Sequence, residues 1–194
     1  MVEIYELCKV FSNPLRLELL AHIYQYKEGC NFGFLVDKML KSKLCASGVS
    51  QYLRELVRLG IVRRHRDGCY TNYHADLSHA SKPIAEITAL VVSRLGKNKN
   101  RDFLRAFQAL RNPFRTNVIR MLAQTGPLAA ESICAKTKHQ SIHLHRDLKP
   151  ALDAKLIVET HLTQMEIIYH YTQPTDPIVV CIMNYLLNPT HLNK

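Results

Sequence analysis

The 194 residues allow one medium domain or two small ones, because domains of about 100–150 residues are the commonest. Hydrophobic residues make up 47% of the chain and charged residues 22%, which excludes collagenous, low-complexity and disordered proteins. The net charge of +10 indicates a polyanionic partner, with nucleic acid first and an anionic membrane surface second.

The six cysteines are scattered singly and form no C-x-x-C pair, which argues against a zinc ribbon, a redox pair and a haem attachment site. This usage is typical of a reducing compartment. Glu3 and Glu6 lie where a signal peptide would be basic, and the apolar runs 84–92 and 178–187 are shorter than the about 20 residues that span a bilayer. The sequence therefore predicts a soluble cytoplasmic protein.

An internal repeat organises the chain. VFSNPLRLELLAHI (10–23) recurs as ALRNPFRTNVIRML (109–122), and VSQYLRELVRLGIV (49–62) recurs as LHRDLKPALDAKLI (144–157). NYHAD (72–76) recurs more loosely as IYHYT (168–172). Three matches in the same order predict two homologous domains, 1–97 and 98–194, divided in the polar stretch 96–102.

In the first half, apolar periodicity predicts helices over 2–11, 14–25, 33–40, 46–59 and 83–95. Asn13 is the expected N-cap of the second helix, with Pro14 in its first position, and Gly60 ends the fourth helix. Two strands, 61–67 and 69–74, are expected around a turn at Asp67-Gly68.

The second half repeats this order, with helices expected over 101–111, 113–124, 129–136, 141–154 and 177–187 and strands over 157–161 and 165–171. The predicted fold class is mainly α with small β-hairpin wings, in two tandem winged helix-turn-helix domains. The apolar helices 2–11, 83–95 and 177–187 are expected to join the halves into an intramolecular pseudo-dimer, with a further homodimer possible.

Helix 46–59 places Val49, Leu53 and Leu56 on one side and polar residues on the other. The second helix of a helix-turn-helix lies in the major groove, where Arg suits guanine and Gln suits adenine. Between residues 38 and 66, eight basic residues stand against one acidic residue, which indicates phosphate contacts by this helix and the following hairpin. The candidate DNA-binding residues are Lys41, Lys43, Ser47, Gly48, Ser50, Gln51, Arg54, Arg58, Arg63, Arg64 and Arg66.

The corresponding stretch of the second half, 133–161, holds five basic residues against three acidic ones, and its hairpin has no Lys or Arg. Pro150 falls inside the helix and is expected to kink it or end it early. The second domain is therefore expected to be a degenerate copy and the DNA footprint asymmetric. Its secondary DNA candidates are His143, His145, Arg146 and Lys149.

FSNPLRLELLAHI with SGVSQYLRELVRLGIVRR, and LRNPFRTNVIRMLA with LHRDLKPALDAKLIV, resemble the ArsR-type winged-helix repressors, although those are typically single domains that form homodimers. The resemblance implies a cytoplasmic transcriptional repressor released by an inducer, with base-reading positions at Ser47, Ser50, Gln51 and Arg54. The metal sites of the family do not carry over. Cys45 has no cysteine partner nearby, and Asp76 and His79 lack the further ligands.

His139 and His143 have a helical spacing compatible with zinc but no third ligand, so neither a metal site nor a cofactor is predicted. No glycine-rich phosphate loop, G-x-S-x-G or carboxylate cluster is present, so no enzyme is expected. The predicted function is sequence-specific binding of double-stranded DNA in transcription regulation. Two alternatives remain, a winged-helix protein-protein adaptor and a plasmid replication initiator.

Overall fold

The computed structural model describes residues 4–95, 102–163 and 166–188. The described chain is mainly helical and contains two small antiparallel three-stranded sheets. It forms two compact units, which we call the N-terminal unit (α2–α5 and β1–β3) and the C-terminal unit (α1, α6–α10 and β4–β6). The expected domain boundary between residues 97 and 98 lies outside the described residues.

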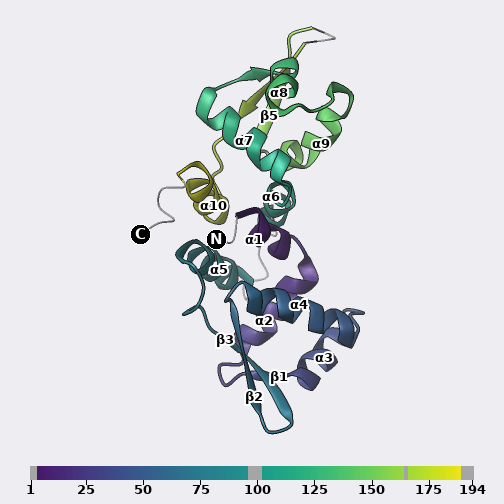
Figure 1. Ribbon diagram of the computed structural model, residues 1–194, viewed down its shortest axis with the longest axis vertical. Coiled ribbons are helices and arrows are strands. Elements are labelled where there is room, and N and C mark those ends of the chain that lie inside the picture. Colours follow the sequence, from purple (N-terminus) through teal and green to yellow (C-terminus); the bar gives the residue numbers. More distant parts are fainter. Residues whose placement is uncertain (1–3, 96–101, 164–165, 189–194) are drawn as a thin grey trace. The chain divides into compact units, whose positions relative to one another are not determined.

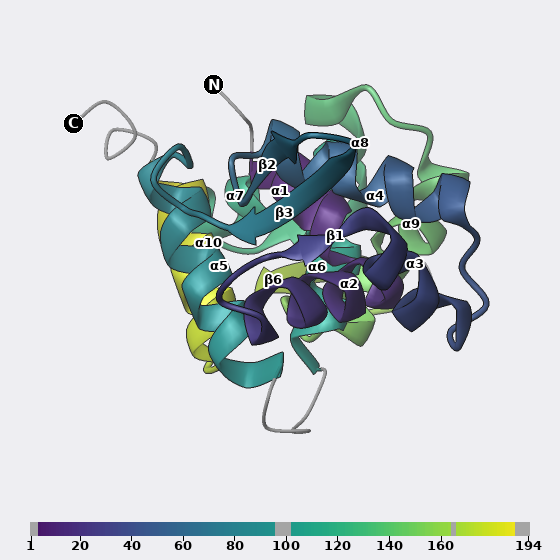
Figure 2. The same cartoon turned by 90° about the horizontal axis from the view of Figure 1, so that it is seen from below.

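The N-terminal unit places three helices before a hairpin and one after it (Figures 1 and 2). Its elements are α2 (Pro14–Gln25), β1 (Cys30–Asn31), α3 (Phe32–Leu40), α4 (Ala46–Arg58), β2 (Val62–Asp67), β3 (Tyr70–Ala75) and α5 (Lys82–Leu95). The strand order is β1-β3-β2, with β3 in the centre. The two-residue strand β1 was not expected, because two residues show no periodicity in a sequence.

The C-terminal unit repeats this order of elements. It consists of α1 (Ile4–Phe11), α6 (Asp102–Leu110), α7 (Pro113–Thr125), β4 (Leu128–Ala129), α8 (Ala130–Thr137), α9 (Ser141–Asp153), β5 (Ile157–His161), β6 (Ile167–Tyr171) and α10 (Pro177–Leu187). Its sheet has the order β4-β6-β5, which matches β1-β3-β2 strand for strand. The elements from α6 to α10 therefore follow the same order as those from α1 to α5, with α6 in the place of α1.

Helix α1 packs on α6 within the C-terminal unit, although the sequence assigns it to the first domain. The rings of Phe11 and Phe107 meet edge to face with 5.5 Å between their centroids, and Phe103 adds a second such contact with Phe107 at 5.7 Å. Leu7 is also fully buried. The first helices of the two repeats thus pack on each other through an apolar stripe, the kind of surface that α-helices bury.

The Asn-Pro pairs start their helices in the same way in both units, as the sequence predicted for Asn13. The Asn13 side-chain oxygen accepts hydrogen bonds from the backbone N–H groups of Leu15 at 2.9 Å and Arg16 at 3.4 Å. Asn112 caps α7 through Phe114 at 2.9 Å and Arg115 at 3.3 Å. Each asparagine satisfies N–H groups that the first helical turn leaves without partners.

Pro150 was expected to kink its helix or end it early, and the early end is wrong, because α9 continues to Asp153 and has 13 residues, as many as α4. A proline removes one backbone donor, but its own carbonyl can still continue the helix. The Pro150 oxygen accepts a hydrogen bond from the Ala154 N–H at 3.1 Å. The buried side chains of Leu148 and Ala151 hold this turn against the unit.

Left-handed residues occur at equivalent places in the two repeats. Lys43 (φ 60°) and Lys138 (φ 54°) follow α3 and α8, and Gly60 (φ 71°) and Lys155 (φ 55°) follow α4 and α9. Each pair is separated by 95 residues, the spacing at which the sequence repeats. The ends of α4 and α9 also share their closing hydrogen bonds, from Ile61 N–H to the Leu56 carbonyl and from Leu156 N–H to the Ala151 carbonyl, both at 3.0 Å.

Candidate nucleic-acid interface

Helix α4 is divided into an apolar and a polar side, as the sequence predicts. Val49, Leu53 and Leu56 are buried, and the side chains of Ser47, Gln51, Arg54 and Arg58 are exposed. Gly48 and Ser50 are half-buried at the border between the two sides. The exposed side presents hydroxyl, amide and guanidinium groups, which match the donors and acceptors on base edges.

Two residues of α2 and its cap hold α4 in place. The Asn13 amide donates a hydrogen bond to the Tyr52 hydroxyl at 3.0 Å, and the Arg16 guanidinium carbon lies 4.8 Å from the centre of the Tyr52 ring. The C-terminal unit has an equivalent contact, because Arg115 donates from Nη1 to the Asp147 carbonyl of α9 at 3.3 Å. The sequence showed both arginines as repeated, but it did not show what they bind.

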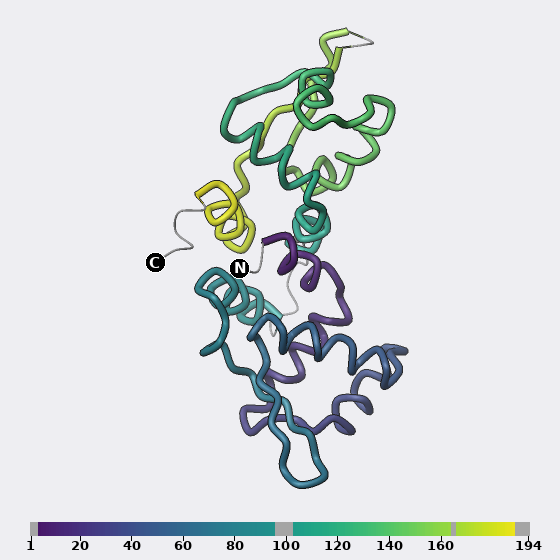
Figure 3. Tube along the Cα trace, viewed as in Figure 1, coloured from purple at the N-terminus to yellow at the C-terminus, as the bar shows by residue number. Residues whose placement is uncertain are grey.

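The β2–β3 hairpin extends beyond the helices of its unit, as the chain trace shows (Figure 3). Strand β2 contacts α4 and pairs with β3 from Val62–Ala75 to Asp67–Tyr70. Gly68 (φ 56°) and Cys69 form the turn, one residue later than predicted, because Asp67 still pairs with Tyr70. The exposed side chains of the hairpin include Arg63, Arg64 and Arg66.

Tyr70, at the tip of the hairpin, is 70% exposed and was missed as a candidate. A large aromatic side chain at this exposure suits contact with a partner. Its position directly after the Gly68–Cys69 turn could have indicated an exposed side chain. The sequence pattern instead assigned Tyr70 to a strand.

Most of the basic side chains of this surface are not neutralised by acids. Arg58 lies 3.1 Å from Glu55 and Arg63 lies 3.9 Å from Asp76. Arg66 donates from Nε to the Gly68 carbonyl at 3.4 Å. Among the residues that the structure describes, no carboxylate lies within ion-pair distance of four exposed cations, Lys41, Lys43, Arg54 and Arg64. We call α4, β2 and these side chains the basic face.

Cys45 is exposed at the N-cap position of α4, with its Sγ 3.1 Å from the Ser47 hydroxyl oxygen. Hydrogen bonds from the Ser47 hydroxyl and the Gly48 backbone lower the pKa of the Cys45 thiol. Burial instead raises the pKa of Cys8 and of Cys30. Of these three thiols, that of Cys45, beside the basic face, is therefore the most easily ionised.

The four secondary candidates lie on α9, where His145, Arg146 and Lys149 are exposed and His143 is half-buried. Three of them face carboxylates. His145 Nε2 lies 3.4 Å from Glu159, Arg146 Nε lies 3.3 Å from Asp147, and Lys149 Nζ lies 3.3 Å from Asp153. The sequence placed these basic residues on one helix but did not show that each has an acidic partner.

His139, whose helical spacing from His143 would suit zinc, contacts Asp147 and Phe114. His139 Nε2 lies 3.0 Å from Asp147 Oδ2, and its ring stacks on Phe114 with 4.1 Å between the centroids. In the part of the chain that the structure describes, no three His, Cys, Asp or Glu side chains gather closely enough to hold a metal ion.

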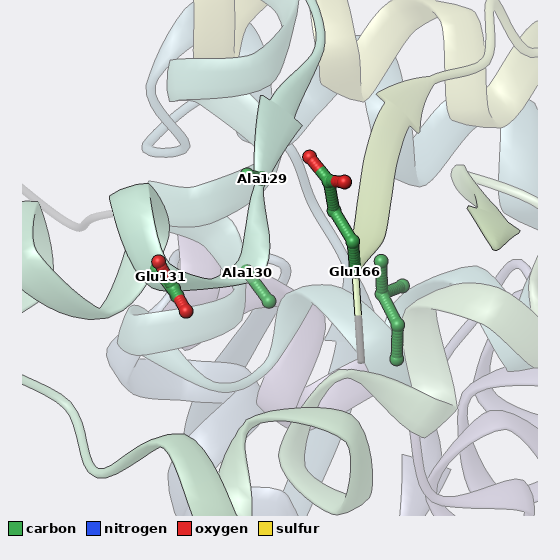
Figure 4. A pocket seen from close by; sticks show the side chains of 5 residues that line it. Ala129, Ala130, Glu131 and Glu166 are labelled. Carbon is green, nitrogen blue, oxygen red and sulfur yellow. The ribbon is translucent and has the colours of Figure 1, made fainter. Parts of the chain in front are cut away.

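A small open pocket lies in the C-terminal unit, lined by Ala129, Ala130, Glu131, Glu166 and Ile167 (Figure 4). Glu131 comes from the start of α8 and Glu166 directly precedes β6. The two carboxylates give this pocket the sign of charge that phosphate avoids.

The chain matches no protein-family model, no curated protein and no solved structure. None of the described helices is both long enough and apolar enough to cross a membrane.

Proposed function

We propose that the chain is a sequence-specific regulator of transcription that binds double-stranded DNA. The observation that carries the proposal is the polar side of α4, exposed next to arginines of β2, with four cations of this face not neutralised by any described acid. In this proposal each unit is a winged helix-turn-helix, with α3 and α4 as the helix-turn-helix of the N-terminal unit and β2–β3 as its wing.

The side chains of the basic face divide into two roles. Arg54 and Gln51, on the exposed side of α4, are suited to bidentate contacts with guanine and adenine in the major groove. Ser47 and Ser50 can contact either kind of base edge. The remaining cations, Lys41, Lys43, Arg58, Arg63, Arg64 and Arg66, are suited to phosphates, which fix the protein on the duplex without reading sequence.

Repression follows as part of the proposal from the resemblance to ArsR-type proteins. Members of that family bind DNA as homodimers, and this chain carries two copies of the domain. The proposal includes an intramolecular counterpart of such a dimer, because one chain supplies both copies.

Binding to duplex DNA in increasing salt tests the proposal. After a preferred sequence has been selected from a random duplex pool, the affinity of the full chain is measured by fluorescence anisotropy. We expect Arg54→Ala to weaken binding to the selected sequence by about 1–3 kcal/mol and to relax the preference at one base pair. Arg64→Ala should weaken binding to all sequences and reduce the slope of log affinity against log salt by about 0.9.

Arg105→Ala is the matched control, because Arg105 is an exposed arginine on α6, outside the basic face. It should change neither the sequence preference nor the affinity as much as Arg54→Ala. Salt-independent binding, or equal effects of all three substitutions, would contradict the proposed function.

A further inference from the structure

The helix and hairpin of the C-terminal unit can be compared with the basic face position by position. Helices α4 and α9 have the same length, and the buried Val49, Leu53 and Leu56 correspond to the buried Leu144, Leu148 and Ala151, each 95 residues later. Strands β2 and β5 begin at the buried residues Val62 and Ile157, at the same spacing. We call α9 with β5 the second face.

On α9, each cation at a position equivalent to a base-reading residue has an acid beside it. Lys149 is equivalent to Arg54 and lies 3.3 Å from Asp153, one turn further along the helix. Arg146 is equivalent to Gln51 and lies 3.3 Å from Asp147. The second face therefore neutralises the cations that would approach a duplex.

The hairpin differs more strongly, because Glu159 of β5 occupies the position of Arg64 in β2. Two imidazoles face this carboxylate. His145 Nε2 of α9 lies 3.4 Å from Glu159 Oε2, and His161 Nε2 of β5 lies 3.5 Å from Glu159 Oε1. His145 is equivalent to Ser50, and His161 is equivalent to Arg66. Glu159 therefore lies beside two side chains whose equivalents belong to the candidate DNA-binding residues of the N-terminal unit.

The Glu159 side chain is largely buried. It is 24% exposed, and its Oε2 atom is buried and has no hydrogen-bond partner among the described residues. On the neighbouring strand it pairs with Tyr169 of β6. Burial, followed by the charges of Glu159 and Cys134, raises the pKa of Tyr169 to about 12. The carboxylate thus lies between α9, β5 and β6, within ion-pair distance of His145 and His161.

We infer that the second face is closed to DNA by its own acids, with Glu159 as the closing residue, and that the chain reads a single non-palindromic DNA element through the N-terminal unit. The inference rests on the proposed function. Phosphate contacts need cations that are free to replace counterions, and a carboxylate at a wing position repels phosphate. The basic face has such cations. In the second face, Glu159 stands at the position of Arg64 and His161 at the position of Arg66.

The test measures the binding of full-length variants to the selected duplex and to a random-sequence duplex. We expect Arg54→Ala to lower the affinity for the selected duplex at least fivefold and Lys149→Ala to lower it less than twofold. Glu159→Arg should tighten binding to the random duplex and steepen its log salt slope by about 0.9, the value of one further phosphate contact. The selected sequence should show one conserved element with no inverted copy.

Two controls keep the result specific. Glu131→Arg makes the same change of charge at an exposed position of the same unit, at the start of α8 and away from the second face, and should tighten binding less than Glu159→Arg does. Glu159→Gln removes the carboxylate charge at constant size and should raise the affinity for the random duplex by less than Glu159→Arg does. If circular dichroism shows that Glu159→Arg does not fold, Glu159→Gln alone tests the role of the carboxylate.

A palindromic selected sequence, a loss from Lys149→Ala equal to that from Arg54→Ala, or equal gains from Glu159→Arg and Glu131→Arg would each overturn the inference. These results differ from failure of the proposed function, in which the unaltered chain shows no salt-dependent binding to any duplex and both proposals fall together.

Discussion

The guanidinium group of Arg16 lies over the ring of Tyr52, with 4.8 Å between its central carbon and the ring centroid. The contact joins the first turn of α2 to the middle of α4, and Asn13 reinforces it with a 3.0 Å hydrogen bond to the Tyr52 hydroxyl. The repeated Asn-Pro-x-Arg motif therefore starts α2 and contacts α4 through Tyr52. In the other repeat, Arg115 reaches the Asp147 backbone, and Asp147 is the equivalent of Tyr52.

Tyr52→Phe should lower the free energy of unfolding by about 1 kcal/mol, because it removes one hydrogen bond and keeps the ring under Arg16. Tyr52→Ala also removes the cation–π contact and the packing of the ring, and should cost about 2–3 kcal/mol. Urea denaturation followed by circular dichroism measures both. Equal losses from the two variants would show that the ring contributes nothing beyond its hydroxyl.

Lys155→Gly should stabilise the protein by up to about 1 kcal/mol, because Lys155 has a positive φ of 55° that side chains with a Cβ disfavour. Lys155→Ala keeps the Cβ and should change stability by less than about 0.5 kcal/mol. Thermal denaturation compares the three proteins. A loss of stability in Lys155→Gly would mean that the lysine side chain contributes more than its backbone conformation costs.

The equivalent glycine should behave in the opposite way. Gly60 has a φ of 71°, and a Cβ added there would lie 2.7 Å from the His79 carbonyl oxygen. Gly60→Ala should therefore destabilise the protein by more than 1 kcal/mol, roughly the left-handed conformational cost plus that of moving the backbone around His79. A variant as stable as the unaltered chain would show that the loop at His79 shifts freely.

Cys45 should react with iodoacetamide at pH 7 before Cys8 and Cys30 do. The thiolate is the reactive form, and the pKa of Cys45 is lowered by the Ser47 hydroxyl, whereas burial raises the pKa of the other two thiols. Mass spectrometry of peptides after timed alkylation gives the order of reaction. Ser47→Ala is the informative variant, since it removes the hydroxyl and should slow the reaction of Cys45 alone.

Stability should fall with acid partly through Asp147. Partial burial would raise the pKa of its carboxyl, but hydrogen bonds and charges from Arg146 and His139 outweigh this and lower it. A pKa that is lower in the folded than in the unfolded chain stabilises the protein above the unfolded value of about 3.9, and this stabilisation is lost as the pH falls through the folded value. Between about pH 5 and pH 3, the free energy of unfolding should therefore fall less steeply in Asp147→Asn than in the unaltered chain.

The helices were predictable because local signals mark both their ends and their periods. Asn13 begins a helix by capping it, Gly60 follows one, and the buried Val49, Leu53 and Leu56 recur at helical spacing. The strand β4, with two residues, has no such pattern and is defined by its pairing with β6. Pro150 does not end α9 early, because a single lost hydrogen bond is outweighed by the packing around it.

The contacts that organise the candidate site were not predictable, since they join residues far apart in the chain. Phe11 meets Phe107 across 96 positions, and Glu159 meets His145 across 14. The sequence could count charges on each face, but a count does not say which cations are already paired. That distinction between the two faces depends on distances.

Helix α1 packs in one unit, whereas α2, which follows it after two residues, belongs to the other. The N-terminal unit is thus inserted between two segments of the C-terminal unit. A protease that cuts once between α5 and α6 would leave the two pieces attached to each other through Phe11 and Phe107. Release of either unit requires a second cut at the two-residue link after Phe11, so a nicked chain should still migrate as one particle under native conditions.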